Sequence, residues 1–142
     1  GQVMRVMGLD VGTRTIGVAV SDALGLTAQG VEVIQRRDLA RDLSRLRELM
    51  AVYEVEGFVV GIPRNMNGTY GPAAEEARRF GEIIREQLQK PVFEEDERLT
   101  TVAAERVLLD ADLSRRRRRQ VVDKVAATLI LENFLARRAN RD

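Results

Sequence analysis

Residues 6–22, with the sequence VMGLDVGTRTIGVAVSD, constrain the fold more than any other stretch of the chain. Two apolar runs separated by a short polar turn are typical of two paired β-strands that are buried in a core. Asp10 lies in the first of these runs, between Leu9 and Val11. An ionised carboxylate that is withdrawn from water is costly unless another group compensates its charge. We therefore expect Asp10 to meet a partner that the hairpin itself does not supply.

The composition limits both the fold and the chemistry. With 142 residues, of which 44% are hydrophobic, we expect one domain over residues 1–142 with a core of its own. The sequence contains no cysteine and no histidine, so chemistry has to rest on carboxylates, hydroxyls and arginines. No apolar run reaches membrane-spanning length and the N-terminus lacks the pattern of a secretion signal, so we expect a cytoplasmic protein with no membrane partner.

Hydrophobic periodicity predicts an α/β fold in which helices pack on a mixed sheet. Three strands in meander order come first, and helices and strands alternate after them. Asp38 is a good N-cap for the first helix, and Pro72 fits the first position of the second. The predicted elements are strands over residues 3–9, 16–20 and 31–34, a helix over 39–53, a strand over 57–62, a helix over 72–88, a strand over 91–99, and helices over 100–109 and 117–138.

Three carboxylates that are far apart in the sequence lie next to predicted core elements. Asp10 lies on the first strand, Glu97 at the end of the last strand and Asp123 near the start of the last helix. The positions that share a helix face with Asp123 are apolar, so Asp123 is expected to face the sheet. Converging carboxylates repel one another unless bound protons or a cation neutralise them. An all-oxygen ligand set of this kind favours Mg²⁺ or Mn²⁺.

Simpler interpretations exist for two of the three acids. Asp123 could pair with Arg119 or Lys124, or it could interact with the positive end of the helix dipole. Glu97 belongs to the acidic run 94–97, and strand alternation alone leaves open whether position 96 or 97 faces the site. Asp10 has the weakest alternative, because Arg14 is the only basic residue near it in the sequence.

Two loops carry groups that could bind phosphate. Gly12 and Gly17 bracket a tight turn in which backbone N–H groups and Arg14 could approach an anion. The loop GIPRNMNGTYGP precedes a predicted helix N-terminus, which is a favourable place for an anion. Its candidate side chains are Arg64, Asn65, Asn67 and Tyr70. Turn chemistry alone would select many of the same residues, so both interpretations remain open.

The charge distribution points to a polyanionic partner. Residues 114–141 carry nine arginines and lysines against two acids, whereas residues 1–113 carry fourteen against nineteen. Five consecutive arginines are rare in a core and suit a phosphate backbone, although a solvated helix start would also explain them. They are Arg115, Arg116, Arg117, Arg118 and Arg119.

Four segments together resemble the YqgF or RuvX group of bacterial proteins, which is related to the RuvC-type Holliday junction resolvases. They are GLDVGTRTIGVAVSD, VVGIPRNMNGTYGP, DERLTT and DKVAATLILENFL, in the family's order and spacing over nearly the whole chain. The resemblance implies a ribonuclease-H-like fold with a mixed five-stranded sheet, in which three antiparallel strands are followed by parallel ones. It also implies an acidic triad of Asp10, Glu97 and Asp123, and it selects Glu97 over Asp96. Glu95 departs from the family pattern, because an aromatic residue often occupies its position.

The resemblance implies a metal-dependent endonuclease. Two Mg²⁺ or Mn²⁺ ions, about 4 Å apart, would activate a water molecule and stabilise the leaving oxygen. The family is linked to maturation of the 5′ end of the small-subunit ribosomal RNA precursor and to cleavage of branched DNA, and the sequence does not choose between them. Because the chain has only six aromatic residues, recognition should rest on phosphates and shape, with Tyr70 as the one exposed candidate for base stacking. Analogy with junction resolvases allows a homodimer.

Two other functions compete with this interpretation. The segment GLDVGTRTIGVAVSD also resembles the first phosphate loop of actin-like ATPases and sugar kinases, but those proteins need two such domains to form a nucleotide cleft. A catalytically silent RNA-binding module that retains the carboxylates as a remnant of its fold is the other alternative. It predicts that the substitution Asp10→Asn leaves function intact.

Overall fold

The computed structural model describes residues 4–64, 67–96 and 115–141, and of these the side chains of 115–121 and 139–141 lie outside the description. The elements follow one another in the order β1 (Val6–Val11), β2 (Thr15–Ser21), β3 (Ala28–Gln35), α1 (Leu39–Val52), β4 (Gly57–Ile62), α2 (Pro72–Leu88), β5 (Val92–Asp96) and α4 (Arg115–Arg141). The helix predicted over residues 100–109 lies outside the described residues.

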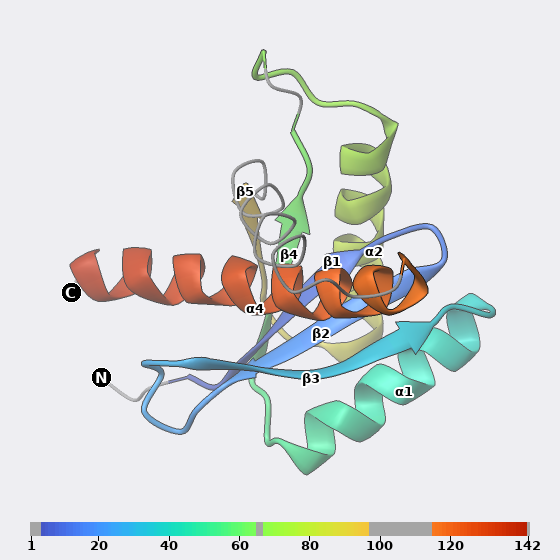
Figure 1. Cartoon of the computed structure of the whole chain (residues 1–142). Helices are drawn as coiled ribbons and strands as arrows, with labels where there is room; N and C mark the ends of the chain where they lie inside the picture. Colours follow the sequence, from blue (N-terminus) through green and yellow to red (C-terminus); the bar gives the residue numbers. More distant parts are fainter. Residues whose placement is uncertain (1–3, 65–66, 97–114, 142) are drawn as a thin grey trace.

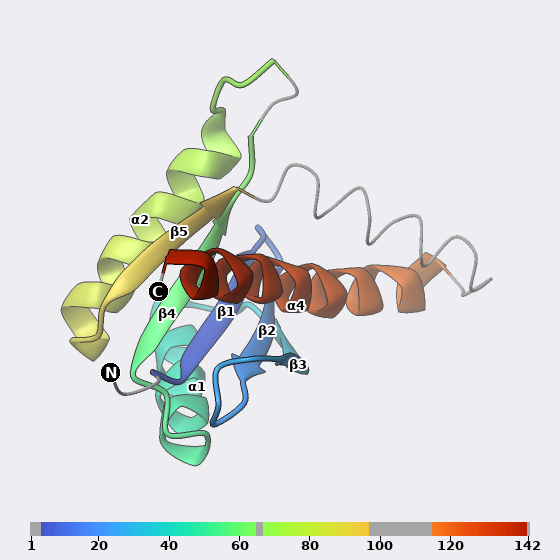
Figure 2. The ribbon, with the colours of Figure 1, turned by 90° about the vertical axis from the view of Figure 1, so that its left-hand side faces the viewer.

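The strands form one mixed sheet in the order β3-β2-β1-β4-β5 (Figure 1). β1, β2 and β3 pair antiparallel, whereas β4 pairs parallel with both β1 and β5. This arrangement confirms the predicted mixed sheet of three meander strands followed by parallel strands. The long helix α4 covers one face, and α1 and α2 cover the other (Figure 2).

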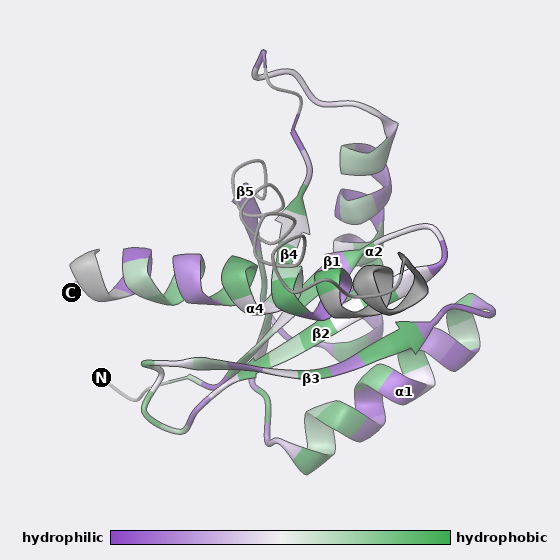
Figure 3. Ribbon diagram, viewed as in Figure 1, coloured by the Kyte–Doolittle hydropathy of each residue, from purple (hydrophilic) through white to green (hydrophobic). Residues whose placement is uncertain are grey.

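Two apolar clusters lie on the two faces of the sheet. The larger one joins the strands to α1 and α2, with Leu46, Phe58 and Ile84 among its fully buried side chains. The smaller one lies under α4 and includes Ile130 and Leu131. In Figure 3 green, the colour of hydrophobic residues, predominates in β2 and at the end of β3, whereas α1 and α2 alternate between green and purple. Alternation of this kind follows from helices that bury one side only.

Local sequence signals explain where several elements begin. The carboxylate of Asp38 accepts a hydrogen bond from the N–H of Arg41 over 2.9 Å and caps α1 as predicted. Pro72 is the first residue of α2, and β4 coincides with the predicted strand over residues 57–62. β3 and α4 are longer than predicted. Within the described part of the chain, no helix has the length and apolar content needed to cross a membrane.

α4 approaches the sheet closely where β1, β2 and β3 each carry a glycine. A Cβ atom on Gly17 would lie 2.1 Å from the carbonyl oxygen of Asp123, closer than any real contact. Cβ atoms on Gly8 and Gly30 would lie 2.9 Å and 2.6 Å from side-chain atoms of α4. The three glycines therefore let the helix backbone settle onto the strands.

The turn between β1 and β2 differs from the prediction. The N–H of Gly12 donates to the carbonyl oxygen of Thr15 over 2.8 Å, which closes a turn at residues 12–14. Gly17 does not belong to this turn but lies inside β2, opposite Asp10 of β1. The prediction that Gly12 and Gly17 together bracket a turn is therefore wrong, because close packing of α4 explains the second glycine.

Candidate active site

Asp10 and Asp123 come together on the face of the sheet that α4 covers. Asp10 lies directly opposite Gly17 in the β1–β2 pair. Opposite residues share a face, with Cβ positions roughly 5 Å apart. Because the backbone of Asp123 rests on that same face of Gly17, Asp123 is the helix residue next to Asp10. Both aspartates are half-buried. The neighbour of Asp10 on this face is thus a second carboxylate, which increases the local negative charge and does not compensate it.

Thr15 is a functional candidate that the sequence did not single out. Its hydroxyl donates a hydrogen bond to Oδ2 of Asp123 over 2.5 Å. Thr15 begins β2 two residues before Gly17, so both face α4. The strand period could have revealed this shared face, but the sequence could not reveal that Asp123 lies above it. The bond fixes the orientation of the Asp123 carboxylate.

The third acid of the predicted triad, Glu97, lies outside the described residues. β5 ends at Asp96, and its side chains alternate between the two faces. Phe93 contacts Phe134 of α4 with 5.1 Å between ring centres, and Glu95 bonds Arg137 of the same helix. Odd-numbered residues of β5 therefore face α4, on the side of Asp10.

The even-numbered residues of β5 face α2. Val92 and Glu94 line a small cavity together with Arg78 of that helix. Asp96 lies 3.4 Å from the guanidinium of Arg64. Asp96 therefore belongs to the face of the sheet opposite to Asp10, which settles the question that strand alternation alone left open for position 96.

The donor chemistry of the described site fits a hard divalent cation. Asp10, Asp123 and Thr15 offer only oxygen atoms, as Mg²⁺ and Mn²⁺ prefer. Their partial exposure leaves room for the water ligands that Mg²⁺ retains. Within the residues that the structure describes, no group of three acids is close enough to hold a metal ion. The described part of the site thus contributes two carboxylates.

Glu95 is a buried carboxylate on the same face of the sheet. Its side chain is 7% exposed and forms an ion pair with Arg137. Burial raises the pKa of Glu95, and the positive charge of Arg137 acts in the opposite direction. The ion pair explains how an acid can occupy a position where the family resemblance leads one to expect an aromatic residue.

The predicted phosphate-binding residues of the β4–α2 loop are engaged within the protein. Arg64 donates to the carbonyl oxygen of Gly68 over 2.7 Å, and its guanidinium lies over the ring of Tyr70. Arg78, which the sequence did not single out, lies over the same ring at 4.3 Å. Tyr70 is 46% exposed, but two guanidinium groups lie over its ring. The ring is therefore already in contact with cations and is not open for base stacking on that side.

The remaining candidates differ in how far the structure describes them. The side-chain oxygen of Asn67 accepts hydrogen bonds from the N–H and the hydroxyl of Thr69, which is turn chemistry. Asn65 lies outside the described residues, and Arg14 is exposed in the turn after β1. The backbone of the five arginines 115–119 forms the first turns of α4, whereas their side chains lie outside the description.

The sequence is similar to a known family and to individual proteins. A family model described as RuvX, Holliday junction resolvase, matches residues 4–137. A protein of Heliobacterium modesticaldum is 61% identical over 137 residues, covering 96% of this chain and 92% of its own. A protein of Moorella thermoacetica is 63% identical over 134 residues, covering 94% and 96%. Both carry the provisional name pre-16S rRNA nuclease.

The fold has a counterpart among solved structures. RuvC of Thermus thermophilus, in a structure of its complex with a Holliday junction substrate, matches with a TM-score of 0.60 and 19% identity. The match covers 96% of this chain and 97% of RuvC. It confirms the predicted RuvC-like, ribonuclease-H-like arrangement of the sheet and helices.

Proposed function

Because the chain belongs to the RuvX family, we propose that it is an endonuclease that hydrolyses phosphodiester bonds in structured nucleic acid with the help of divalent metal ions. The strongest support is that two half-buried aspartates, Asp10 and Asp123, lie next to each other on the face of the sheet that α4 covers. Asp10 lies opposite Gly17, and the backbone of Asp123 packs on Gly17. Two neighbouring carboxylates repel each other when no cation is present. The arrangement becomes favourable when a cation binds both carboxylates on one side and a phosphate on the other.

The residues have separate roles in this proposal. Asp10 and Asp123 hold the metal, and the hydroxyl of Thr15 keeps the Asp123 carboxylate in one orientation. Two Mg²⁺ or Mn²⁺ ions, when bound, supply the acidity that activates water and the charge that stabilises the leaving oxygen. The close seating of α4 on Gly17 fixes the spacing of the two aspartates.

We assign Glu97 as the third carboxylate. The parity of β5 supports it, because odd-numbered side chains of this strand face α4. Asp96 is the neighbouring acid of opposite parity and already pairs with Arg64. The matched substitutions Glu97→Gln and Asp96→Asn separate the two, since only the first should abolish cleavage.

The leading substrate is the precursor of small-subunit ribosomal RNA, because the relatives at about 60% identity are provisionally named for it. Branched DNA is the second candidate and is favoured by the description of the family model. If branched DNA is the substrate, we also propose a homodimer, in which two sites cut symmetrically placed strands. In either case the activity is assigned to one domain over residues 1–142 that works in the cytoplasm.

The test offers both substrates to the purified protein. A precursor ribosomal RNA fragment and a four-way DNA junction are incubated with Mg²⁺, with Mn²⁺ or with EDTA. We expect metal-dependent cleavage that Asp10→Asn abolishes and that Asp38→Asn leaves unchanged, because asparagine also caps a helix.

The outcomes distinguish the competing functions. Cleavage of neither substrate, or cleavage that Asp10→Asn does not affect, rejects the proposal. Binding without cleavage supports a silent RNA-binding module, and turnover of ATP supports a kinase-like domain.

A further inference from the structure

The turn after β1 and the segment that joins β3 to α1 lie side by side, at the right in Figure 1. The N–H of Arg36 donates to the carbonyl oxygen of Arg14 over 2.9 Å. This bond continues the β2–β3 pairing one step beyond Thr15 and Gln35. The two segments are therefore one extension of the sheet, next to the end of β1 that carries Asp10.

The side chain of Arg36 braces this extension. Its guanidinium donates to the carbonyl oxygen of Gly12 over 2.8 Å and to the carboxylate of Asp42 in α1 over 3.2 Å. It also lies 5.1 Å from the ring centre of Phe80 in α2. Asp42 is 3% exposed and accepts a further hydrogen bond from the N–H of Arg37. One half-buried cation thus ties the turn to both helices, and Asp42 neutralises its charge.

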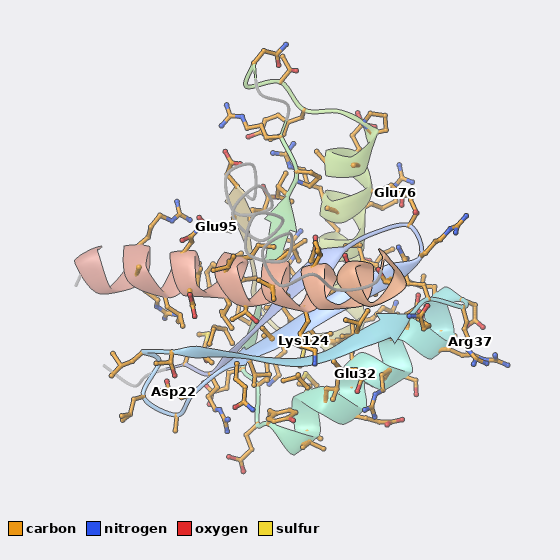
Figure 4. All side chains as sticks on the ribbon, viewed as in Figure 1. Asp22, Glu32, Arg37, Glu76, Glu95 and Lys124 are labelled. Atoms are coloured by element: carbon orange, nitrogen blue, oxygen red, sulfur yellow. The ribbon has the colours of Figure 1, made fainter. Side chains whose placement is uncertain are left out.

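Two other arginines of the extension are exposed to solvent. Within the part of the chain that the structure describes, the guanidinium groups of Arg14 and Arg37 have no hydrogen bond or ion pair. Arg37 points away from the body of the protein (Figure 4). The arginines in the first two turns of α1 are paired, Arg41 with Asp38 and Arg45 with acids on both sides of it. The uncompensated positive charge of this region therefore lies at positions 14 and 37.

A hollow in the surface lies beside the guanidinium group of Arg37. It has a volume of about 410 Å³ and is lined by Ile34, Gln35, Arg37, Arg41, Asp42 and Arg45. The only acid in this lining is Asp42, which is buried and already paired with Arg36. Because Arg41 and Arg45 also pair with acids, Arg37 is the one charged group of this lining that no described acid compensates.

We propose that Arg14 and Arg37, held in place by Arg36, bind the phosphate backbone of a nucleic acid as it passes the carboxylate site. This inference rests on the proposed nuclease function. Guanidinium groups suit phosphate because their donors form a planar fork. The contacts of Arg36 already hold the backbones of Arg14 and Arg37 in place. Binding therefore costs these two residues less conformational entropy. Arg14 directly precedes Thr15, whose hydroxyl bonds Asp123 on the α4 face of the sheet, whereas the hollow beside Arg37 lies on the face that α1 covers.

The proposal is tested by measuring the binding of nucleic acid in EDTA, where metal-dependent cleavage does not occur. The probes are a fluorescently labelled four-way DNA junction and a labelled RNA hairpin, each titrated with the whole protein at several salt concentrations. Each phosphate contact to duplex DNA contributes about 0.9 to the slope of log affinity against log salt. We expect Arg14→Gln and Arg37→Gln each to lower the slope by about that amount, regardless of base sequence.

The matched control is Arg47→Gln. Arg47 also lies on α1 but donates to the carbonyl oxygen of Gln87, at the far end of α2. The substitution Arg47→Gln removes the same charge as the other two, but at a place outside the proposed binding surface. The salt slope of this variant should therefore equal that of the unchanged protein. Slopes for Arg14→Gln and Arg37→Gln that match the Arg47→Gln slope overturn the inference. If the unchanged protein binds neither probe, the proposed function itself fails.

Arg36→Lys separates positioning from charge. Lysine keeps the positive charge but lacks the fork that reaches both Gly12 and Asp42. We expect weaker binding and a smaller salt slope at unchanged net charge, with circular dichroism confirming the fold. An unchanged slope overturns the role of Arg36 as a brace. Should this variant not fold, the two surface variants decide the outcome.

Discussion

Asp10 is the residue on which the proposed site depends most. Its strand buries Leu9 completely on one side and turns Asp10 to the other, where α4 delivers Asp123. The carboxylate of Asp123 accepts a hydrogen bond from the hydroxyl of Thr15, 108 positions earlier in the chain.

Thr15 provides the prediction at this scale. Thr15→Val preserves the shape of the side chain and removes the hydrogen bond to Asp123, so the carboxylate loses its fixed orientation. We expect the Mg²⁺ concentration for half-maximal cleavage to rise by about 10-fold to 100-fold. Thr15→Ser retains the hydroxyl and should remain close to the unchanged protein. Equal metal requirements for the valine and serine variants would contradict this role.

At the scale of elements, α4 is the part that completes the site. It packs across β1, β2 and β3 on three glycines and reaches β5 through Phe134 and Arg137. Its apolar face was predictable from periodicity, and Ile130 and Phe134 are buried as expected. The close approach was not predictable, because the sequence shows that Gly17 lacks a side chain but not which backbone needs the space.

Gly17→Ala tests how closely α4 is seated. The added Cβ would meet the backbone of Asp123, which cannot move aside as a flexible side chain can. We expect a loss of about 1 to 3 kcal/mol in the free energy of unfolding, measured with urea, and a loss of cleavage as Asp123 moves.

The matched control is Gly81→Ala on the other face of the sheet, where the new Cβ would lie 3.3 Å from a side-chain atom of Val92. Its stability should change much less. An equal loss in both variants would show that the position of α4 has no special importance.

At the scale of the whole molecule, much of the architecture was readable and the site was readable in part. The apolar run of β4 and the proline at the start of α2 marked their elements directly. Asp10 stood out because a charge in a buried strand is costly. Thr15, Arg36 and Arg78 were missed, because each acts through contacts between segments that are distant in the sequence, and a sequence pattern records only neighbours.

Metal binding should stabilise the whole protein. A ligand at 100 times its Kd adds about 2.7 kcal/mol to the free energy of unfolding, which corresponds to a rise in Tm of roughly 10 °C for a domain of this size. We expect Mg²⁺ or Mn²⁺ to raise Tm in a thermal melt of the unchanged protein. In EDTA, Asp10→Asn should melt at a higher temperature than the unchanged protein, because it removes repulsion between carboxylates. A Tm that ignores the metal in both proteins would contradict the site.

The docking of α4 on the first strands has a consequence during translation. β1, β2 and β3 leave the ribosome first, whereas Asp123 follows only after most of the polypeptide has been made. In the proposed site, a nascent chain would carry Asp10 before Asp123 has been made. We therefore expect a ribosome-bound chain that stops before α4 to lack nuclease activity.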